Sequence, residues 1–454
     1  MTFRLRSLPF FSSAVLLVGA TVLPAAAQGQ QYIVSFQKGT PRNARAATVA
    51  RHGAGLRFNY NVIDGVAVTV PNENALRALA ADASVRSITP DYPVFASQAE
   101  QASDKARENA KGGRKPGGDG GGGTGSTQVL PLGVQRVGAP TATSTGAGIG
   151  VAILDTGIDL NQADLGTITG SYNAFDESSN CQDNNGHGTH VAGTIAALNN
   201  TRDVVGVAPE ATLYCVKVLD AQGNGNWSRV IAGLDWVYNF GSSMSPPIRV
   251  VNMSLGGPGK ADPSSPLEIA IKQLYDAGIV VVVAAGNDPA LDVSQQVPAA
   301  YPEVLTIAST TAVAGIAGCS LQVAADTASY FTSDGAGVTI SAPGEDQENI
   351  SRTGRNCYLN SVGILSLKLG GGTTRMSGSS MATPHVSGIV ARLLQNEGIY
   401  GIATAGDGGD TEQIRWYFIE AERGAQFQSV APLDSPAAGY TYDSAREGIA
   451  VITH

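Results

Sequence analysis

Near its C-terminal end the chain reads GSSMATP over Gly378–Pro384, and an apolar helical pattern follows at once. Apolar residues recur there at steps of three and four, which indicates a helix buried on at least one side. We expect Pro384 to lie in the first turn of this helix, where its missing N–H costs nothing. A serine at such an entrance lies among unpaired N–H groups at the positive end of the helix dipole. We therefore interpret Ser380 as a nucleophile, although a serine at this place can also be only a helix cap.

Two motifs upstream supply what a serine nucleophile lacks. VAILDTG (Val151–Gly157) is an apolar run that delivers Asp155 to the end of a buried strand. HGTHVAG (His187–Gly193) has glycines that allow a tight turn before a helix of small residues. A serine hydroxyl needs an imidazole to take its proton, and the imidazole needs a carboxylate to fix its tautomer. Asp155, His187 and Ser380 therefore predict a nucleophilic triad, the alternatives being a helix-capping aspartate and a loop histidine.

Together with NMSLG (Asn252–Gly256) and AAGN (Ala284–Asn287), these motifs resemble those of the subtilisin-like serine proteases, the subtilases. The order Asp, His, Ser along the chain is also that of subtilisin. The resemblance implies a serine endopeptidase that hydrolyses peptide bonds through an acyl-enzyme on Ser380. It makes His187 the general base and then the general acid, and it makes Asp155 the residue that orients this histidine.

The same resemblance assigns an oxyanion donor and a substrate-binding cleft. It makes the Asn287 amide a donor beside the backbone N–H of Ser380, although an asparagine after a glycine is also a common turn residue. One segment would pair with an extended peptide through its backbone, and a second would form the opposite wall of an open, apolar pocket. These six substrate-binding residues are Ser254, Leu255 and Gly256 in the first segment and Ala284, Ala285 and Gly286 in the second.

Short runs rich in valine and isoleucine alternate with helical patterns from Val129 onward. Continuous apolar strands that alternate with helices indicate a parallel sheet with both faces covered. We therefore predict an α/β catalytic domain over residues 129–454, with a parallel sheet sandwiched by helices as in subtilisin. Its catalytic residues should gather at the carboxyl ends of the strands. The expected strands are 150–154, 212–219, 249–254, 279–285 and 304–307, the expected helices include 230–238, 267–277 and 411–423, and closing strands are expected at 439–442 and 448–452.

The first 27 residues combine a basic start at Arg4 and Arg6 with an apolar middle and small residues before Gln28. This pattern predicts a secretory signal peptide, residues 1–27, that is removed after Ala27. A membrane anchor is the alternative, but the apolar run is short for a membrane span. No later stretch reads as a membrane span either. We therefore expect a secreted protein, extracellular or periplasmic, without a membrane anchor after signal removal.

Residues 28–97 read as a small separate unit with the order β-α-β-β-α-β, which predicts a ferredoxin-like α+β module. The unit resembles the inhibitory propeptide of secreted subtilases, notably in VRSITPD (Val85–Asp91); an unrelated packing domain is the alternative. The resemblance implies an intramolecular inhibitor whose C-terminal tail lies in the active-site cleft. Residues 98–128 form a basic, glycine-rich linker, which is typical of an easily cleaved segment. We expect maturation cleavage between about Phe95 and Gln128.

Charge divides the chain in the same way. Residues 1–128 carry 14 Lys and Arg against 8 Asp and Glu, whereas residues 129–454 carry 15 against 30. Because the mature part is acidic, we do not expect nucleic acid as a partner. The expected partners of a monomer are polypeptide substrates and its own propeptide. Two other classes stay open: a catalytically silent binding module with the subtilase fold, which the intact triad argues against, and an esterase that uses the same triad.

The four cysteines all lie in the part that we expect to be exported, and four cysteines allow three pairings. Cys181 precedes the motif at His187 and Cys215 lies within a strand, while Cys319 and Cys357 lie in stretches that look inserted relative to the family. We therefore predict the disulfides Cys181–Cys215 and Cys319–Cys357, with free thiols as the alternative.

Two further expectations come from the resemblance alone. No cofactor is expected for catalysis, but subtilases commonly bind structural calcium. Asp159, Asp164 or Asp183 could contribute to such a site, although the sequence identifies no metal ligands. His190 and His385 lie inside the motifs but have no catalytic role in the family, so we expect them to be packing or hydrogen-bonding residues.

Overall fold

The computed structural model describes residues 29–97, 127–353, 356–396, 409–419, 432–434 and 447–452. The predicted signal peptide, nearly all of the predicted linker and the closing strand expected at 439–442 lie outside these residues. Within the described ranges, no helix is both long and apolar enough to cross a membrane.

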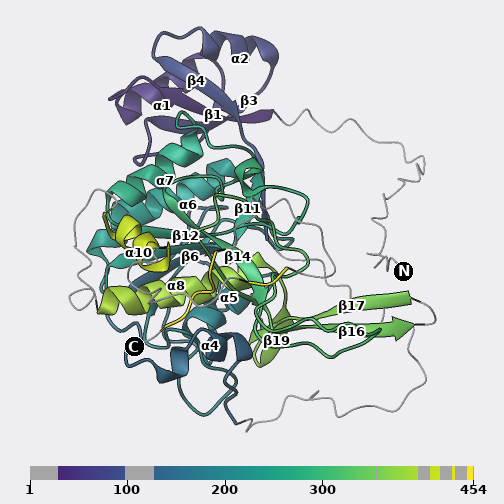
Figure 1. The fold of residues 1–454 in the computed structure, drawn as a ribbon. Coiled ribbons are helices and arrows are strands. Elements are labelled where there is room, and N and C mark those ends of the chain that lie inside the picture. Colours follow the sequence, from purple (N-terminus) through teal and green to yellow (C-terminus); the bar gives the residue numbers. More distant parts are fainter. Residues whose placement is uncertain are drawn as a thin grey trace, which may run out of the picture.

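The N-terminal module has the element order that the sequence predicted. Its elements are β1 (Gln30–Phe36), α1 (Arg42–Arg51), β2 (Gly55–Asn59), β3 (Gly65–Val70), α2 (Glu73–Ala80) and β4 (Val85–Pro90). The four strands form an antiparallel sheet in the order β2-β3-β1-β4. Side chains alternate across this sheet: Val34 and Val66 pack with Leu79 of α2, whereas Ile33 and Ala67 join a core of the larger domain. The module is therefore packed onto that domain, beside α6 and α7 (Figure 1).

The larger domain is built on a seven-stranded sheet in which all neighbouring strands are parallel, in the order β15-β14-β12-β10-β6-β8-β7. Its strands are β6 (Gly150–Asp155), β7 (Gly170–Asn173), β8 (Thr212–Lys217), β10 (Ile248–Met253), β12 (Val280–Ala284), β14 (Val304–Thr311) and β15 (Ile340–Glu345). The predicted parallel sheet is confirmed, and the strands predicted within it lie within two residues of the observed bounds, apart from the longer C-terminal end of β14.

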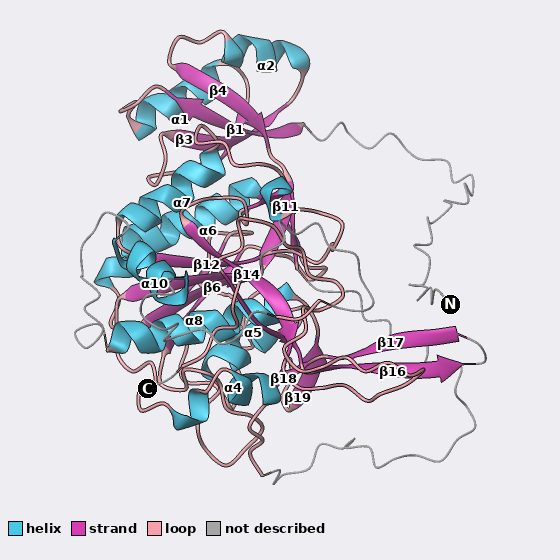
Figure 2. Cartoon of the chain, viewed as in Figure 1, coloured by secondary structure: helices cyan, strands magenta, loops and turns pink. Residues whose placement is uncertain are grey.

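Helices cover both faces of this sheet (Figure 2). One face packs against α5 (His187–Ala196) and α8 (Ser379–Gln395), and the other packs against α6 (Trp227–Phe240) and α7 (Pro266–Asp276). Successive residues of β6 show the alternation, because Val151 and Ile153 point to the first core and Ala152 and Leu154 to the second. The larger domain also has the helices α4 (Leu132–Arg136) and α10 (Gly409–Ile419) and the 3-10 turns η1 (Ala139–Thr141), η2 (Gly241–Ser243) and η3 (Val293–Gln295).

A second sheet joins the tail of the N-terminal module to the larger domain. The tail strand β5 (Pro93–Ala96) lies between β11 (Leu255–Pro258) and β9 (Asn224–Asn226), antiparallel to both, and β13 (Gln296–Val297) pairs with the far side of β11. The tail thus completes a sheet whose other strands all come from the larger domain.

Two hairpins follow the central sheet. They are β16 (Gln347–Thr353) with β17 (Asn356–Val362), and β18 (Ile364–Leu367) with β19 (Thr373–Met376). The first hairpin projects well beyond the body of the domain (Figure 1). The disulfide Cys319–Cys357 attaches it to the preceding loop. With Cys181–Cys215 this gives the predicted pairing of all four cysteines.

Candidate functional site

The residues of the predicted triad come together from three elements. Asp155 is the last residue of β6, His187 is the first residue of α5, and Ser380 is the second residue of α8. All three side chains are buried beneath the tail of the N-terminal module or the surrounding loops. The carboxyl ends of the parallel strands therefore collect these groups, as expected for an open α/β sheet.

Asp155 and His187 are in direct contact. The ring nitrogen Nδ1 of His187 lies 2.7 Å from Asp155 Oδ1, and both side chains are 0 % exposed. Asp155 Oδ1 also accepts a hydrogen bond from the backbone N–H of Thr156. A carboxylate that accepts from Nδ1 leaves Nε2 as the atom available to exchange a proton. Among the described residues, His187 Nε2 has no partner.

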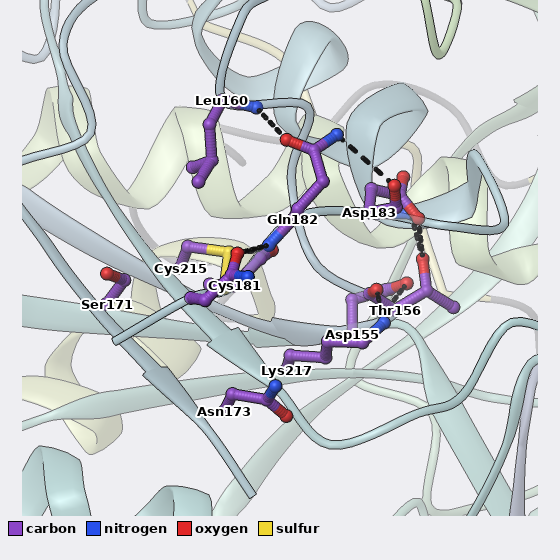
Figure 3. Close-up of a disulfide and its surroundings, with 12 residues drawn as sticks. Asp155, Thr156, Leu160, Ser171, Asn173, Cys181, Gln182, Asp183, Cys215 and Lys217 are labelled. Carbon is purple, nitrogen blue, oxygen red and sulfur yellow. Dashed lines mark hydrogen bonds between the residues drawn. A yellow bond between two sulfur atoms is a disulfide. The ribbon is translucent and has the colours of Figure 1, made fainter. Parts of the chain in front are cut away.

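The loop before α5 is fixed by Asp183. Its Oδ1 accepts hydrogen bonds from Thr156 Oγ1 and from the backbone N–H groups of Asn185 and Gly186. Its Oδ2 accepts from both the N–H and the hydroxyl of Thr189. Asp183 therefore caps the helix that starts at His187 and ties it to the residue after Asp155. Figure 3 shows the bond between Asp183 and Thr156 and, beside Gln182, the disulfide Cys181–Cys215.

The hydroxyl of Ser380 is turned toward the substrate-binding strand rather than toward the histidine. Its Oγ donates to the carbonyl of Ser254 at 2.9 Å. A rotation about the Cα–Cβ bond of Ser380 is thus needed to bring Oγ to an imidazole acceptor. This is a common situation, because catalytic hydrogen bonds are often formed only in the complex with substrate.

Pro384 does not lie in the first turn of α8, as we expected, but in the second turn, inside the helix. A proline there removes the N–H that would otherwise bond to the carbonyl four residues earlier, which is that of Ser380. The hydroxyl of Ser254 supplies the missing donor at 2.9 Å. The carbonyl left free by the proline is thus bonded to Ser254, in the segment predicted to bind substrate.

The side-chain amide of Asn287, the predicted oxyanion donor, is held in one orientation. Its Oδ1 accepts from the backbone N–H of Ser379 at 2.8 Å, which fixes the orientation of the amide. Its Nδ2 is buried and has no partner within the described part of the chain. The backbone N–H of Ser380 points to the carbonyl oxygen of Ser97 at 3.4 Å. A carbonyl at this place thus lies where negative charge could be stabilised.

Strand β5 occupies the cleft as an extended peptide. Ala96 pairs with Leu255 and Phe95 with Gly256. The N–H of Ser97 donates to the carbonyl of Ser254 at 3.1 Å. The segment that the sequence assigned to substrate pairing therefore pairs with a peptide in this structure, and that peptide is the tail of the chain's own N-terminal module.

The expected pocket beside this strand is neither open nor purely apolar. The carboxamide of Gln296 lies against Gly286, so that a Cβ atom there would be 2.4 Å from Gln296 Nε2. This amide also donates to Ser333 Oγ at 2.8 Å. On the other side, a Cβ atom on Gly256 would lie 3.4 Å from the Val297 carbonyl oxygen and 3.9 Å from the Ser97 hydroxyl. We missed Gln296 because no motif carries it.

Lys217 and Asp183 were also missed as part of the site. Lys217 Nζ donates to the carbonyl of Thr156, directly after Asp155. Lys217 could have been noticed in the sequence, because it is the single charged residue in the apolar run over 212–219. His190 and His385 fit the expected packing role. Burial lowers their pKa values to about 3 and about 4, so both rings are neutral at physiological pH.

All three aspartates considered for calcium accept hydrogen bonds, and those of Asp164 come from Asn200 Nδ2 and from the N–H of Val204, two residues of the loop at 198–204. The two carboxylate oxygens of Asp183 accept the five hydrogen bonds described above. Asp159 accepts hydrogen bonds from the N–H groups of Asn161 and Gly370. Asp164 is fully buried and contacts Asn200 Nδ2 at 2.6 Å. Within the described ranges, no group of three His, Cys, Asp or Glu side chains is arranged for a metal.

Backbone and amide oxygens converge on the side chain of Gln128. Its Nε2 donates to the carbonyls of Leu198 at 2.7 Å and Val204 at 3.0 Å, and it lies 3.4 Å from Asn200 Oδ1 and from the carbonyl of Arg202. Calcium prefers six to eight oxygen ligands of this mixed kind. A partly positive NH₂ group thus lies where four oxygens and, through Asn200, the Asp164 carboxylate could surround a cation.

Comparisons with known proteins agree with this site. The profile of the Subtilase family matches residues 146–415. Subtilisin amylosacchariticus of Bacillus subtilis subsp. amylosacchariticus is 32 % identical over 373 residues, which are 80 % of each chain. Subtilisin Savinase of Lederbergia lenta is 40 % identical over 271 residues, 59 % of this chain and 85 % of that protein.

A solved structure described as a cold adapted subtilisin-like serine proteinase superposes with a TM-score of 0.52 at 29 % identity, covering 71 % of this chain and 98 % of that one. The matched family, the similar enzymes and the observed fold lead to the same assignment. The chain therefore belongs to the subtilase family of subtilisin-like serine proteases and is a serine-type endopeptidase.

Proposed function

We propose that this protein cleaves extended polypeptides by acyl transfer through Ser380, with His187 as the proton carrier and Asp155 as its orienting carboxylate. One observation carries the proposal: an extended strand is bound antiparallel to β11, with the carbonyl of its last described residue, Ser97, at the N–H of Ser380. Backbone pairing of this kind holds a peptide without regard to most of its side chains. It suits a polypeptide better than a small ester.

The chemistry follows from the available atoms. Ser380 Oγ rotates from the Ser254 carbonyl to His187 Nε2, which takes its proton as the oxygen attacks the substrate carbonyl. The imidazolium is stabilised by Asp155, which already accepts from Nδ1 at 2.7 Å. His187 then donates this proton to the departing amine. A water molecule then attacks the acyl-enzyme while His187 takes its proton, and His187 returns a proton to Ser380 Oγ as the acyl group leaves as a carboxylic acid.

Negative charge on the attacked carbonyl oxygen is stabilised by two donors. One is the backbone N–H of Ser380, and the other is Asn287 Nδ2, which has no other described partner. Because Asn287 is held by the N–H of Ser379, its amide needs no reorientation during the reaction. Loss of one such donor typically lowers turnover by about 10²–10³.

The N-terminal module acts as an intramolecular inhibitor and as the first substrate. Its tail fills the cleft, and the Ser97 carbonyl is the group that Ser380 would attack first. We therefore place the first cut on the carboxyl side of Ser97, inside the interval expected from the sequence. Removal of the remaining linker would need further cuts. Export by the signal peptide fits the two disulfides, which persist in oxidising compartments.

A structural calcium ion completes the proposal. The residues around Gln128 fit the ion, because six residues could supply oxygen ligands if the Gln128 amide turns its own oxygen inward. The ligands would be Gln128, Asp164, Asn200 and the carbonyls of Leu198, Arg202 and Val204. The ion would fix the N-terminal segment of the mature enzyme to the loop at 198–204 and would take no part in the reaction.

Expression of the full chain beside a Ser380→Ala variant tests the proposed function. Ser243→Ala is the matched control, since Ser243 lies on the surface in η2. We expect wild type and control to release an N-terminal fragment whose mass ends at Ser97, to hydrolyse casein and to be labelled by an organophosphate at Ser380. The Ser380→Ala chain should stay uncut in a protease-deficient host. A wild-type chain without label or casein hydrolysis would instead support the binding module.

A further inference from the structure

Lys217 lies beside Asp155 in the central sheet. The parallel register of β6 and β8 places the two residues opposite one another at the carboxyl ends of their strands. Lys217 is 6 % exposed and Asp155 is 0 % exposed. A buried ammonium group is costly unless hydrogen bonds and opposite charges compensate it. The groups around Lys217 Nζ must therefore offset the cost of burying its charge.

The ammonium group is held by the residue that follows Asp155. Lys217 Nζ donates to the Thr156 carbonyl, and the ring of Phe175 lies 5.9 Å from it. Burial lowers the pKa of Lys217, while the carboxylates of Asp183, Asp155 and Asp220 act in the opposite direction. Figure 3 shows Lys217 directly beneath Asp155 and Thr156.

Thr156 connects this lysine to both carboxylates of the site. Its N–H donates to Asp155 Oδ1 at 2.7 Å, and its hydroxyl donates to Asp183 Oδ1 at 2.9 Å. The same hydroxyl accepts from the N–H of Gly188, the residue after His187. The bond from Lys217 to the Thr156 carbonyl therefore fixes the Thr156–Gly157 peptide, which directly follows the peptide whose N–H binds Asp155.

A disulfide joins the two segments that carry Lys217 and Asp183. Cys215 precedes Lys217 by two residues on β8, and Cys181 precedes Asp183 by two residues in the loop. Their bond joins the two segments across a Cα–Cα distance of 6.1 Å. The lysine and the second carboxylate are thus fixed relative to each other and to Asp155.

Lys217 offsets part of the negative charge of the group formed by Asp155, Asp183, His187 and Lys217, which we call the unit. Asp155 and Asp183 are buried carboxylates, and Asp155 Oδ2 has no hydrogen-bond partner among the described residues. With Lys217 charged, the unit carries one net negative charge when His187 is neutral and none when it is protonated. Without Lys217 the unit would carry two negative charges, which would attract a proton to His187 before substrate arrives.

We propose that Lys217 is a positioning residue of the reaction, holding the Thr156–Gly157 peptide beside Asp155 and offsetting one of the two buried carboxylate charges next to His187. The inference rests on the proposed function. The charged or titratable groups that face His187 are Asp155 from β6, Asp183 from the loop, Lys217 from β8 and His190 from its own helix. His190 is neutral, so Lys217 is the one cation among these described groups.

The test is the pH dependence of kcat/KM on a soluble peptide amide, measured for mature wild type, Lys217→Met and Asp183→Asn. Loss of the cation should raise the proton affinity of His187 and move the acid limb up by about one pH unit. Activity at pH 6 would then fall about tenfold more than at pH 9. Loss of the Asp183 charge should move the acid limb in the opposite direction. Lys272→Met, at an exposed lysine on α7, should leave the profile unchanged.

A purely structural role would lower activity by the same factor at every pH, and that result would overturn the proposal. If Lys217→Met does not fold, Lys217→Arg should keep the wild-type profile, and the opposite shift in Asp183→Asn must still appear. An unmoved limb in Asp183→Asn would also overturn the proposal. Failure of the proposed function looks different, because wild type itself would then show no hydrolysis that depends on Ser380.

Discussion

The side-chain amide of Gln296 packs against Gly286. A Cβ atom on this glycine would lie 2.4 Å from Gln296 Nε2. Gln296 belongs to β13, next to the strand that binds the tail of the N-terminal module. Its amide therefore takes up space in the pocket that would receive the side chain of the residue whose carbonyl is attacked. The residue at that place in this structure is Ser97, which has a small polar side chain.

We expect Gln296→Ala to widen the choice of substrate. Peptide amides with phenylalanine at the cleaved position should gain at least about tenfold in kcat/KM relative to those with serine, since filling an apolar pocket is worth about 1–3 kcal/mol. The measurement is the ratio of kcat/KM for two peptides that differ only at this residue. Gln322→Ala is a control, because Gln322 bonds to Gly315 in the loop that Cys319 joins to the hairpin. An unchanged ratio in Gln296→Ala would show that Gln296 does not limit the pocket.

Glu348 should make the folded protein less stable in alkaline solution. Burial raises its pKa to about 8, and its Oε2 has no described partner. The native state therefore keeps a proton that the unfolded chain has lost, and stability falls as pH rises from the ordinary range of glutamate toward 8. Glu345, which burial and the charge of Glu348 affect in the same direction, adds to this effect.

Glu348→Gln should remove this loss. In a Ser380→Ala background, which prevents self-digestion, the variant should exceed its parent in free energy of unfolding by at least about 1 kcal/mol at pH 9, with a smaller difference at pH 5. Urea unfolding at the two pH values measures this. Glu73→Gln serves as control, since that side chain is 62 % exposed. Equal effects at both pH values would mean that Glu348 is ionised in the folded protein.

The sequence was sufficient for features that depend on local pattern. Runs such as 150–154 and 279–285 are apolar throughout, and this pattern is typical of a strand inside a covered parallel sheet. The three motifs of the triad lie at element ends, where sheet topology brings them together without further information. The disulfide pairing followed for a similar reason, because each cysteine lies near its partner's motif or inserted stretch.

Other features depend on contacts that no local pattern records. Pro384 was placed one turn too early, because a proline inside the helix is accommodated by a distant donor, the Ser254 hydroxyl, which bonds to the Ser380 carbonyl. The pocket was expected to be open because its two walls are glycine and alanine, but Gln296 reaches it from a separate strand. Asp183 and Lys217 act through Thr156, a relationship that appears only when β6, β8 and the loop are assembled.

The two disulfides should contribute unequally although their loops are of similar length, with sequence separations of 34 and 38. In the chain-entropy model each would contribute about 4 kcal/mol. Cys181 and Cys215 are fully buried behind the site, whereas Cys319 and Cys357 are partly exposed beside a projecting hairpin. We expect Cys181→Ala/Cys215→Ala to lower both the melting temperature and kcat/KM, and Cys319→Ala/Cys357→Ala to leave kcat/KM within about twofold. Calorimetry and peptide hydrolysis on both variants decide this, and equal losses of activity would contradict it.

Calcium should stabilise the protein through Asp164. A ligand that binds only the folded state adds about 2.7 kcal/mol when its concentration is 100 times its Kd, so chelation should lower the melting temperature of the Ser380→Ala chain. Asp164→Asn removes the carboxylate beside Asn200 and should abolish most of this calcium response while the variant still folds. Asp176→Asn, at an exposed carboxylate outside the Gln128 cluster, should respond like the parent. If Asp164→Asn kept the full response, the stabilising ion would have to bind elsewhere, and the oxygens around Gln128 would serve only to hold its amide.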